Sequence, residues 1–577
     1  MTDRLSISLG QYSCAGAKPA NQDFHGTIQP EPPLLATKGI AIAIADGIST
    51  SAQGAVAAET AVKSFLSDYY ATSEGWSVRT SAERVIAATN GWMHARNVRD
   101  LGRTPDDAER ERGLITTFSA VVLKSQLAHL FHIGDARIAR ISDGRLAPLT
   151  SAHRVNLGGG ESYLARAMGM NRHVEIDYAR VPVEPGDLFV LTTDGVHEHL
   201  SDAALTALAL GGETLGDAAR AIADAALAGG STDNLTVQLV RIDTLPPGEI
   251  GDVLGDDLTL ALPEPLRAGQ SFEGYSVIRL LHSGSRSHVW LARDPETGLR
   301  VTIKLPSTEH AADLHQMRAL LLEEWVARRL DNPHVVAAAP RRAPRRHACS
   351  ILCFAEGQTL NEWIADGSDR DVATMRVIVQ QIATAIQAFH RREMLHRDLR
   401  PHNIVIDGDG TVRLIDFGSV QVAGLDEMAR HAADDSAFAG TQQYSAPELR
   451  QGSPASRGTD LWSLGVIAYQ LLTGALPYGP RAAAADDRAA LRRLQYVPAQ
   501  TFNPDIPTWV DAAIARAVAI DPAARYDELS EFLYDLSHPN PALVAPDAPP
   551  WLHRRPERVW QVATALSLAA LIASLIL

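Results

Sequence analysis

The chain has 577 residues, enough for two to four domains of about 150 residues each. Hydrophobic residues make up 46% of it and charged residues 21%, which is typical of globular domains and excludes a largely disordered chain. A net charge of −15 argues against nucleic acid as the main partner. Three cysteines are too few for a disulfide framework and contain no CxxC pair, so a reducing environment is the simpler account.

Residues 6–242 alternate short apolar runs with alanine-rich stretches. The runs 39–47, 118–124, 188–195 and 234–242 are apolar or alternating and are bounded by Gly, Asp or Asn, which predicts strands. Residues 54–70 and 81–96 have the apolar spacing of helices. Strands framed by helices in this way favour an α+β sandwich for this part of the chain.

A set of aspartates follows these predicted strands: Asp23, Asp46, Asp135, Asp194 and Asp233. A carboxylate at a strand end is held rigidly at the edge of a sheet, and several converging carboxylates repel one another unless cations lie between them. Oxygen-only ligands suit Mg²⁺ or Mn²⁺, and two such ions can bind a phosphate and activate water. Any one of these aspartates alone is more often part of an ordinary Asp-Gly turn.

The ordered motifs NQD, ADG, GDAR, TTDG and TDN resemble those of the type 2C metal-dependent protein phosphatases over nearly all of residues 6–242. The resemblance implies an α-β-β-α sandwich that hydrolyses phosphoserine and phosphothreonine with metal-bound water. It implies that two core ions, Mg²⁺ or Mn²⁺, are held by Asp46, the Gly47 carbonyl, Asp194 and Asp233. Asp23 would act near or through metal-bound waters, and Asp135 matches the position linked to a third, weaker ion.

Two positions depart from that family pattern. Lys18 stands where the family usually has a phosphate-binding Arg, and Lys binds phosphate as a point charge without the bidentate geometry of Arg. Ala152 replaces the Asp of the T-x-D-H motif that often follows GDxR. The predicted metal ligands are all present, so activity is still expected.

Residues 243–270 are rich in Pro, Gly and Asp and are interpreted as a linker. The next part, residues 271–536, contains HRDLRPHN (396–403), DFG (416–418), GTQQYSAPE (440–448) and TDLWSLGV (459–466). This set resembles the eukaryotic-type Ser/Thr protein kinases, and it implies a two-lobed fold that binds ATP and Mg²⁺. HRDLR and GT-x-x-Y-x-APE favour Ser/Thr over Tyr as the phosphate acceptor.

The kinase resemblance assigns a role to each matching residue. Lys304 would hold the α- and β-phosphates, with Glu323 as its ion-pair partner and Glu324 as the alternative if the helix register differs. Asp398 would accept the proton of the substrate hydroxyl, and Arg400, in place of the usual Lys, would neutralise the γ-phosphate. Asn403 and Asp416 would bind Mg²⁺. Glu448 and Arg525 are expected to form a structural ion pair.

The loop that would cover the phosphates is the weakest match, because residues 282–289 keep only Gly284 of the family glycines, followed by Val289. Residues 352–355, with Cys353 and Ala355, are expected to form the hinge that contacts adenine. Ser419, Ser436 and Thr441 lie between DFG and APE, and a phosphate there could order the segment through Arg397. The glycine-poor loop keeps a catalytically silent pseudokinase open as an alternative.

Residues 559–577 are uncharged and follow a Pro-rich, then basic spacer at residues 537–558. A helix of that length spans about 28 Å, close to the thickness of a bilayer core, and the preceding arginines favour a cytoplasmic position for the catalytic domains. The expectation is a single-pass tail anchor, with a buried or amphipathic helix as the alternative.

Taken together, the sequence predicts a membrane-tethered signalling enzyme that phosphorylates and dephosphorylates proteins, its own kinase domain included. The alternative is a membrane-tethered scaffold in which one of the two domains is catalytically silent. Protein substrates and the membrane are the expected partners, and nucleic acid is not.

Overall fold

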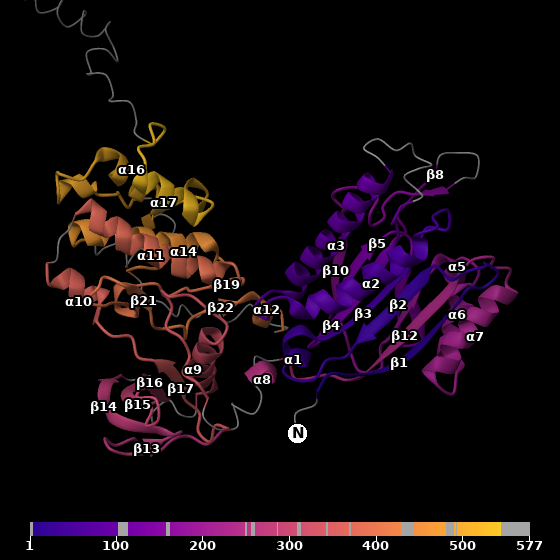
Figure 1. Cartoon of the computed structure of the whole chain (residues 1–577), viewed down its shortest axis with the longest axis horizontal. Coiled ribbons are helices and arrows are strands. Elements are labelled where there is room, and N and C mark those ends of the chain that lie inside the picture. The colour runs from indigo at the N-terminus through magenta and orange to yellow at the C-terminus, as the bar shows by residue number, and fades with distance from the viewer. Residues whose placement is uncertain are drawn as a thin grey trace, which may run out of the picture.

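A computed structural model gives the fold of most of the chain. It describes residues 4–101, 113–156, 162–248, 251–254, 260–284, 287–307, 313–341, 344–367, 371–428, 443–479, 490–491 and 493–543. Two domains follow one another along the chain and lie side by side (Figure 1). The predicted tail anchor at residues 559–577 lies outside the described residues.

Two antiparallel five-stranded sheets form the centre of the first domain. One sheet has the order β1 (Ser6–Cys14), β12 (Leu235–Thr244), β11 (Leu188–Thr192), β6 (Arg137–Ser142) and β7 (Arg145–Pro148). The other has the order β10 (Asp177–Pro182), β5 (Leu127–Ile133), β4 (Phe118–Lys124), β3 (Ile40–Asp46) and β2 (Asp23–Ile28). A small hairpin, β8 (Arg154–Asn156) with β9 (Ser162–Leu164), stands apart from both sheets.

Strand β3 explains how the layers pack. Its isoleucines at 40, 42 and 44 belong to the core between the two sheets, whereas its alanines at 41, 43 and 45 belong to the core under the helices. The small alanines let α2 (Gly54–Ala71) and α3 (Val78–Leu101) lie close to this sheet. Helices α6 (Asp202–Gly211) and α7 (Leu215–Ala228) cover the other sheet, so the α-β-β-α sandwich expected from the sequence is present.

The second domain has two lobes (Figure 1). The smaller lobe is a five-stranded antiparallel sheet of β13 (Ser271–Phe272), β14 (Tyr275–Ser283), β15 (Ser287–Arg293), β16 (Arg300–Pro306) and β17 (Ser350–Cys353). Helix α9 (Leu314–Ala327) packs against β16 and β17. This arrangement places one long helix beside the strand that carries Lys304.

The larger lobe is mainly helical and shares one hydrophobic core. Its longer helices are α10 (Leu360–Ala365), α11 (Val372–His390), α14 (Arg457–Thr473), α16 (Thr508–Ala517) and α17 (Leu529–Ser537). Its short strands are β18 (Gln358–Thr359), β19 (Met394–Leu395), β20 (Ile404–Ile406), β21 (Val412–Leu414) and β22 (Gln421–Val422). The short helices α12 (Ala423–Asp426) and α13 (Pro447–Arg450) complete the segment around the predicted catalytic loops.

Two segments differ in detail from what their composition suggests. The predicted linker contains a short helix, α8 (Gly251–Leu254), because Leu254 is buried in the core of the second domain. Among the described residues, α11 alone is long and apolar enough to cross a membrane. Half of its most apolar window is buried within the protein, and Ile378, Ile382 and Phe389 pack into the core of the larger lobe, so it is a core helix.

Candidate functional sites

The predicted metal-binding aspartates of the first domain converge from both sheets. Asp23 begins β2 and pairs in register with Asp46, the last residue of β3. Asp194 begins the short helix α5 (Asp194–His197) just after β11, and Asp233 comes just before the neighbouring strand β12. Interaction with the Asp46 side chain lowers the pKa of both Asp23 and Asp194, so the three carboxyl groups belong to one cluster.

The Asp23 carboxyl group is buried and is held by two threonine side chains. Its Oδ2 accepts hydrogen bonds from Thr193 Oγ1 at 2.9 Å and Thr236 Oγ1 at 2.7 Å, which come from the opposite sheet. Its Oδ1 is buried and has no hydrogen-bond partner. Burial, opposed by these hydrogen bonds and assisted by the charge of Asp194, raises the pKa of Asp23 to about 7.

The other carboxyl groups are also hard to ionise together. Burial and then the charges of Asp23 and Asp194 raise the pKa of Asp46 well above its usual value. Burial and then Asp194 raise the pKa of Asp135, and burial also raises that of Asp194. Full ionisation of the cluster would therefore need positive charge beyond that of the nearby basic side chains, which is the condition for binding cations.

Two basic side chains of the chain itself bind the rim of this cluster. Arg154 donates from Nε to Asp135 Oδ2 and from Nη2 to Asp194 Oδ2, each at 2.7 Å. Lys18 lies 3.3 Å from Asp233 Oδ2, with both side chains about one-third exposed. The Lys18 predicted to bind phosphate thus lies beside a predicted metal ligand.

The donor set fits hard divalent cations. It consists of carboxylates and the Gly47 carbonyl, which are the oxygen ligands that Mg²⁺ and Mn²⁺ prefer, and the buried Asp23 Oδ1 has no hydrogen-bond partner within the protein. No group of three or more His, Cys, Asp or Glu side chains within the described ranges is already arranged to hold an ion. Asp135 and Asp194 pair with Arg154, and Asp233 pairs with Lys18.

In the second domain, Lys304 on β16 lies between two carboxylates. Its Nζ is 3.2 Å from Glu323 Oε2 on α9 and 3.2 Å from Asp416 Oδ1. The alternative partner, Glu324, faces the other way and pairs with Arg345 at 2.7 Å and Arg328 at 2.6 Å. The helix register therefore puts Glu323 at the predicted phosphate-binding lysine.

Charge compensation inside this triad is nearly complete. Burial alone would lower the pKa of Lys304, but Asp416 and Glu323 raise it above its usual value. Burial would likewise raise the pKa of Asp416, but Lys304 holds it below the usual range. Glu323 is the exception, because burial raises its pKa to about 7 in spite of Lys304. Lys304 thus keeps its charge, as phosphate binding requires.

The predicted catalytic loop brings Asp398, Arg400 and Asn403 together. Asn403 Nδ2 donates to Asp398 Oδ2 at 3.0 Å and to the Asp398 carbonyl at 2.8 Å, which fixes the carboxylate. Arg400 Nε is 3.5 Å from Asp398 Oδ2. Ile415 donates its backbone N–H to the Asn403 carbonyl, which ties this loop to the strand end that presents Asp416.

The remaining predicted residues are placed as follows. Gly284 ends the β14–β15 hairpin and donates its N–H to the Ser287 carbonyl, while Val289 on β15 pairs with Lys304. Cys353 ends β17 and Ala355 follows it in the connection between the lobes. Ser419 lies just after Gly418, and Ser436 and Thr441 lie outside the described residues.

Comparison with known proteins adds the family of each domain. A protein phosphatase 2C family model matches residues 11–228, and a protein kinase domain model matches residues 275–542. The chain joins a phosphatase 2C domain to a protein kinase domain.

Curated relatives match the kinase domain. The serine/threonine-protein kinase PrkC of Bacillus subtilis is 30% identical over 264 residues, covering 45% of this chain and 40% of that protein. The serine/threonine-protein kinase PknJ of Mycobacterium tuberculosis is 29% identical over 274 residues, covering 47% of this chain and 46% of that protein. The chain thus spans less than half the length of these relatives.

Solved structures resemble each half. The Streptococcus agalactiae (S. agalactiae) serine/threonine phosphatase is 24% identical, with a TM-score of 0.36, and the match covers 41% of this chain and 100% of that one. The Mycobacterium tuberculosis PknI kinase domain is 27% identical, also with a TM-score of 0.36, and the match covers 48% of this chain and 99% of that one.

Two residues that sequence reasoning did not single out shape these sites. In the phosphatase domain, Arg154 neutralises part of the aspartate cluster, and only its position after His153 in the altered T-x-D-H region could have drawn attention to it. In the kinase domain, the buried Asp460 accepts hydrogen bonds from the backbone N–H of His396 and of Arg397, each at 3.0 Å. Asp460 thereby holds the catalytic loop, and its place as an acid in the apolar run TDLWSLGV was the available signal.

The expected structural pair is also formed in the kinase domain. Arg525 Nη1 and Nη2 donate to the two carboxylate oxygens of Glu448 at 2.7 and 2.8 Å, and the Arg525 side chain is fully buried. A bidentate pair of this kind anchors the segment that follows the predicted phosphosites to the helical lobe.

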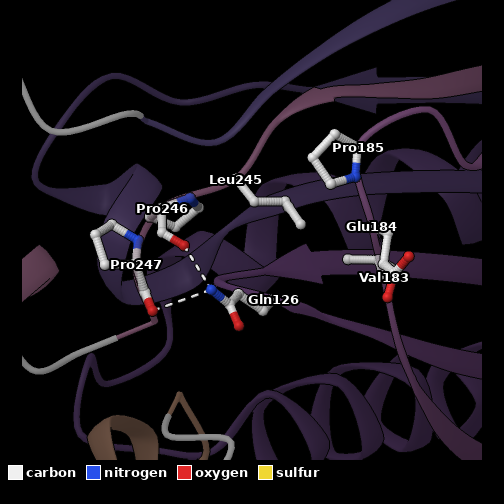
Figure 2. Close-up of a pocket in the computed structure, with 7 residues that line it drawn as sticks. All are labelled: Gln126, Val183, Glu184, Pro185, Leu245, Pro246 and Pro247. Carbon is white, nitrogen blue, oxygen red and sulfur yellow. Dashed lines mark hydrogen bonds between the residues drawn. The ribbon is translucent and has the colours of Figure 1, made fainter.

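A separate hollow of about 510 Å³ lies away from both clusters, at the start of the linker. It is lined by Gln126, Val183, Glu184, Pro185, Leu245, Pro246 and Pro247 (Figure 2). None of these residues belongs to the predicted catalytic sets, so we assign the chemistry to the two clusters and not to this hollow.

Proposed function

We propose that the chain is a bifunctional signalling enzyme that phosphorylates Ser/Thr residues of proteins with ATP and hydrolyses phosphoserine and phosphothreonine with divalent cations. The observation that carries this proposal is the Lys304–Glu323–Asp416 triad beside the fixed Asp398, since it supplies the charges that phosphoryl transfer needs. The convergence of aspartates in the first domain supports the phosphatase activity.

In the kinase domain, Asp398 orients the substrate hydroxyl and accepts its proton as the oxygen attacks the γ-phosphorus, and the bond from that phosphorus to the β,γ-bridging oxygen breaks to release ADP. Asn403 holds the Asp398 carboxylate in place through its amide. Lys304 binds the α- and β-phosphates, and Arg400 compensates charge on the transferred group. Asn403 and Asp416 would hold Mg²⁺, which supplies further positive charge at the phosphates.

In the phosphatase domain, Asp46, the Gly47 carbonyl, Asp194 and Asp233 would hold two divalent cations. Mg²⁺ or Mn²⁺ bound there would polarise the phosphate and activate water. Asp23 is positioned by Thr193 and Thr236 to orient a water in the cluster, and Lys18 offers a positive charge for the substrate phosphate. Asp135 would contribute to a third, weaker ion once Arg154 releases it.

The experiment is an intact-mass measurement of the full chain incubated with ATP, Mg²⁺ and Mn²⁺. We expect Asp194→Asn to accumulate phosphates that wild type does not keep and that Asp398→Asn never gains. That outcome requires a working kinase and a working phosphatase, and it makes the chain one of its own substrates, with Ser419, Ser436 and Thr441 as candidate positions. Failure of every variant to gain mass excludes self-phosphorylation.

A second assay uses external substrates, so that it does not depend on self-phosphorylation. Label transfer from ATP to a basic protein should fall about 10²- to 10⁴-fold in Asp398→Asn, the range for loss of a general base. Hydrolysis of p-nitrophenyl phosphate should be lost in Asp194→Asn and retained in Asp398→Asn.

One alternative is favoured by specific observations. The phosphate-covering loop keeps only Gly284 of the family glycines, and Lys18 replaces the usual Arg, so one domain could bind its ligand without turning it over. In that case the chain is a scaffold. Saturable ATP or metal binding with no turnover on external substrates, in a wild-type chain that unfolds cooperatively, would establish that alternative.

We also propose that residues 559–577 tether the enzyme to a membrane, with both catalytic domains in the cytoplasm. The support is the sequence alone: an uncharged run preceded by Arg554, Arg555 and Arg558. Sedimentation with membranes after alkaline carbonate washing, lost when residues 559–577 are removed, is the expected result. A chain that stays in the supernatant contradicts the tether.

A further inference from the structure

The two domains meet on a defined polar surface. On the phosphatase side it consists of the α2–α3 loop, the first turn of α3 and the β4–β5 turn. On the kinase side it consists of the turn after α11, helix α12 and the two residues that follow α12. Figure 1 shows α12 against one end of the phosphatase sheets and α5, which begins with Asp194, towards the other end.

Two kinase carboxylates bind the N-terminus of phosphatase helix α3. Glu393 accepts hydrogen bonds from the backbone N–H of Ser77 at 2.9 Å and from Thr80 Oγ1 at 2.6 Å. Glu427 accepts from the backbone N–H of Val78 at 3.0 Å. Helix α3 has no acidic residue in its own first turn, so the kinase supplies the negative charge that a helix N-terminus favours.

A buried lysine crosses the same surface. Lys124, at the end of β4, donates to the Gly424 carbonyl at 2.6 Å and to Glu427 Oε1 at 2.7 Å. Its side chain is 1% exposed and that of Glu427 is 10% exposed. Both partners belong to the kinase domain, so the contact that buries this ammonium group also supplies the carbonyl and the carboxylate that satisfy it.

Two glycines permit the close approach of the backbones. Gly424 donates its N–H to the Gly75 carbonyl at 3.0 Å. A Cβ on Gly424 would lie 2.7 Å from the Trp76 carbonyl oxygen, and a Cβ on Gly75 would lie 2.7 Å from the Arg392 carbonyl oxygen. Neither glycine has a positive φ, so alanine is compatible with the local backbone and would act mainly on the interface.

The linker is fastened to the same surface. Gln126, in the turn that follows Lys124, donates to the carbonyls of Pro246 at 2.9 Å and Pro247 at 3.0 Å (Figure 2). Helix α8 of the linker packs against α1 (Leu34–Lys38) of the phosphatase domain and against α9 of the kinase domain. The linker therefore leaves the phosphatase domain beside the docking surface, which favours contact within one chain.

The kinase elements in this contact adjoin the segments that carry its predicted catalytic side chains. The Glu393 turn leads through β19 into the catalytic loop, and α12 follows the Asp416–Gly418 segment. Just after α9, which presents Glu323, Arg329 pairs with Glu74 of the phosphatase domain at 2.9 Å. In this docked arrangement the Lys304–Glu323 pair is formed.

We propose that the docked phosphatase domain is an allosteric activator of the kinase domain. It holds α9 and the start of the segment between DFG and APE, residues 416–428, in the catalytically competent arrangement. The effect is a population shift, because docking stabilises only the arrangement whose surface matches it. This inference rests on the kinase activity proposed above. The aspartate cluster lies at the other end of β3, about 20 Å along the strand at 3.3 Å per residue, so docking and phosphatase chemistry are separable.

The test compares the full-length variants Gly424→Ala and Gly75→Ala with wild type. Gly408→Ala and Gly91→Ala are the matched controls in each domain, because a Cβ there meets no atom within 4 Å. Hydrogen-exchange mass spectrometry follows docking at residues 75–80 and 423–428. Label transfer to a basic protein follows the kinase, and hydrolysis of p-nitrophenyl phosphate follows the phosphatase.

We expect faster exchange in both segments, kinase activity reduced at least about fivefold, the lower end of the range for allosteric coupling, and unchanged phosphatase activity. The controls should match wild type in all three readouts. Faster exchange with equal or higher kinase activity overturns the proposal, as does unchanged exchange in both interface variants. A wild type without kinase activity but with protected segments would contradict the proposed function itself and leave the docking surface established.

Discussion

At the kinase site, Lys304 lies between Glu323 and Asp416, and the chain supplies most of the compensating charge from within. At the phosphatase site, five aspartates converge, and Arg154 and Lys18 reach only the rim of the cluster. The pKa of Asp416 stays below its usual value although burial raises that of Glu323 to about 7, whereas the pKa values of Asp23 and Asp46 both rise above their usual values. The comparison teaches that opposite charges from the chain itself meet at the kinase site, whereas the carboxyl groups of the phosphatase site are compensated only at their rim.

Removing the lysine of the kinase site should have the largest effect. Lys304→Met leaves Glu323 buried without its partner, and we expect the kinase domain to lose about 3 kcal/mol of unfolding free energy, the low end for breaking a buried ion pair because Lys304 is 22% exposed. Amide hydrogen exchange in the core helices of each domain measures this loss of unfolding free energy. The double variant Lys304→Met with Glu323→Gln should recover part of the lost unfolding free energy. A Lys304→Met variant as stable as wild type would show that Lys304 does not compensate the charges of Glu323 and Asp416.

Cations should stabilise the other site. At about 100 times its dissociation constant, Mn²⁺ should raise the unfolding free energy of the phosphatase domain by about 2.7 kcal/mol, since it binds only the folded cluster. Calorimetry of the full chain with and without chelator measures the shift. Asp194→Asn should remove most of it, and an equal shift in that variant would mean that the ions bind elsewhere.

A variant of Arg154 tests whether a basic side chain at the edge of the aspartate cluster competes with metal ions for the carboxylates. Arg154→Ala frees Asp135 and Asp194 of an internal cation, so we expect a Mn²⁺ dissociation constant about fivefold lower, equivalent to about 1 kcal/mol. Titration calorimetry is the measurement. Arg137→Ala is the matched control, because Arg137 pairs with Asp202 and not with the cluster. Weaker metal binding in Arg154→Ala would make Arg154 a supporting residue of the site.

Lys18 should show the smallest effect. Its pair with Asp233 is about one-third exposed on both sides, so Lys18→Met should change the unfolding free energy of the phosphatase domain by less than about 1 kcal/mol. Hydrogen exchange under the conditions used for Lys304→Met gives a direct comparison of the two lysines. A loss of unfolding free energy as large as that in Lys304→Met would mean that the two lysines contribute equally to the stability of their domains.

The sequence by itself determined much of the fold and the composition of both sites. Apolar runs ending in Asp46 and Asp194 predict strands that place carboxylates at sheet edges, because strand geometry is local and periodic. The resemblance of the motifs around Lys304, Asp398, Asn403 and Asp416 to those of protein kinases likewise implied phosphoryl transfer. The order of the strands within each sheet was not available from this pattern, since pairing joins residues far apart in the chain.

Only the tertiary structure decided the rest. The sequence favoured Glu323 and kept Glu324 as the alternative, and the packing of α9 on β16 places Glu323 at Lys304 while Glu324 meets Arg345. The sequence around Lys124 predicts only the end of a strand. The burial of Lys124 against Glu427 depends on a contact between residues 303 positions apart in the chain. Such contacts leave no periodic trace in the sequence, because they arise from how two finished surfaces fit together and not from the local conformation of either segment.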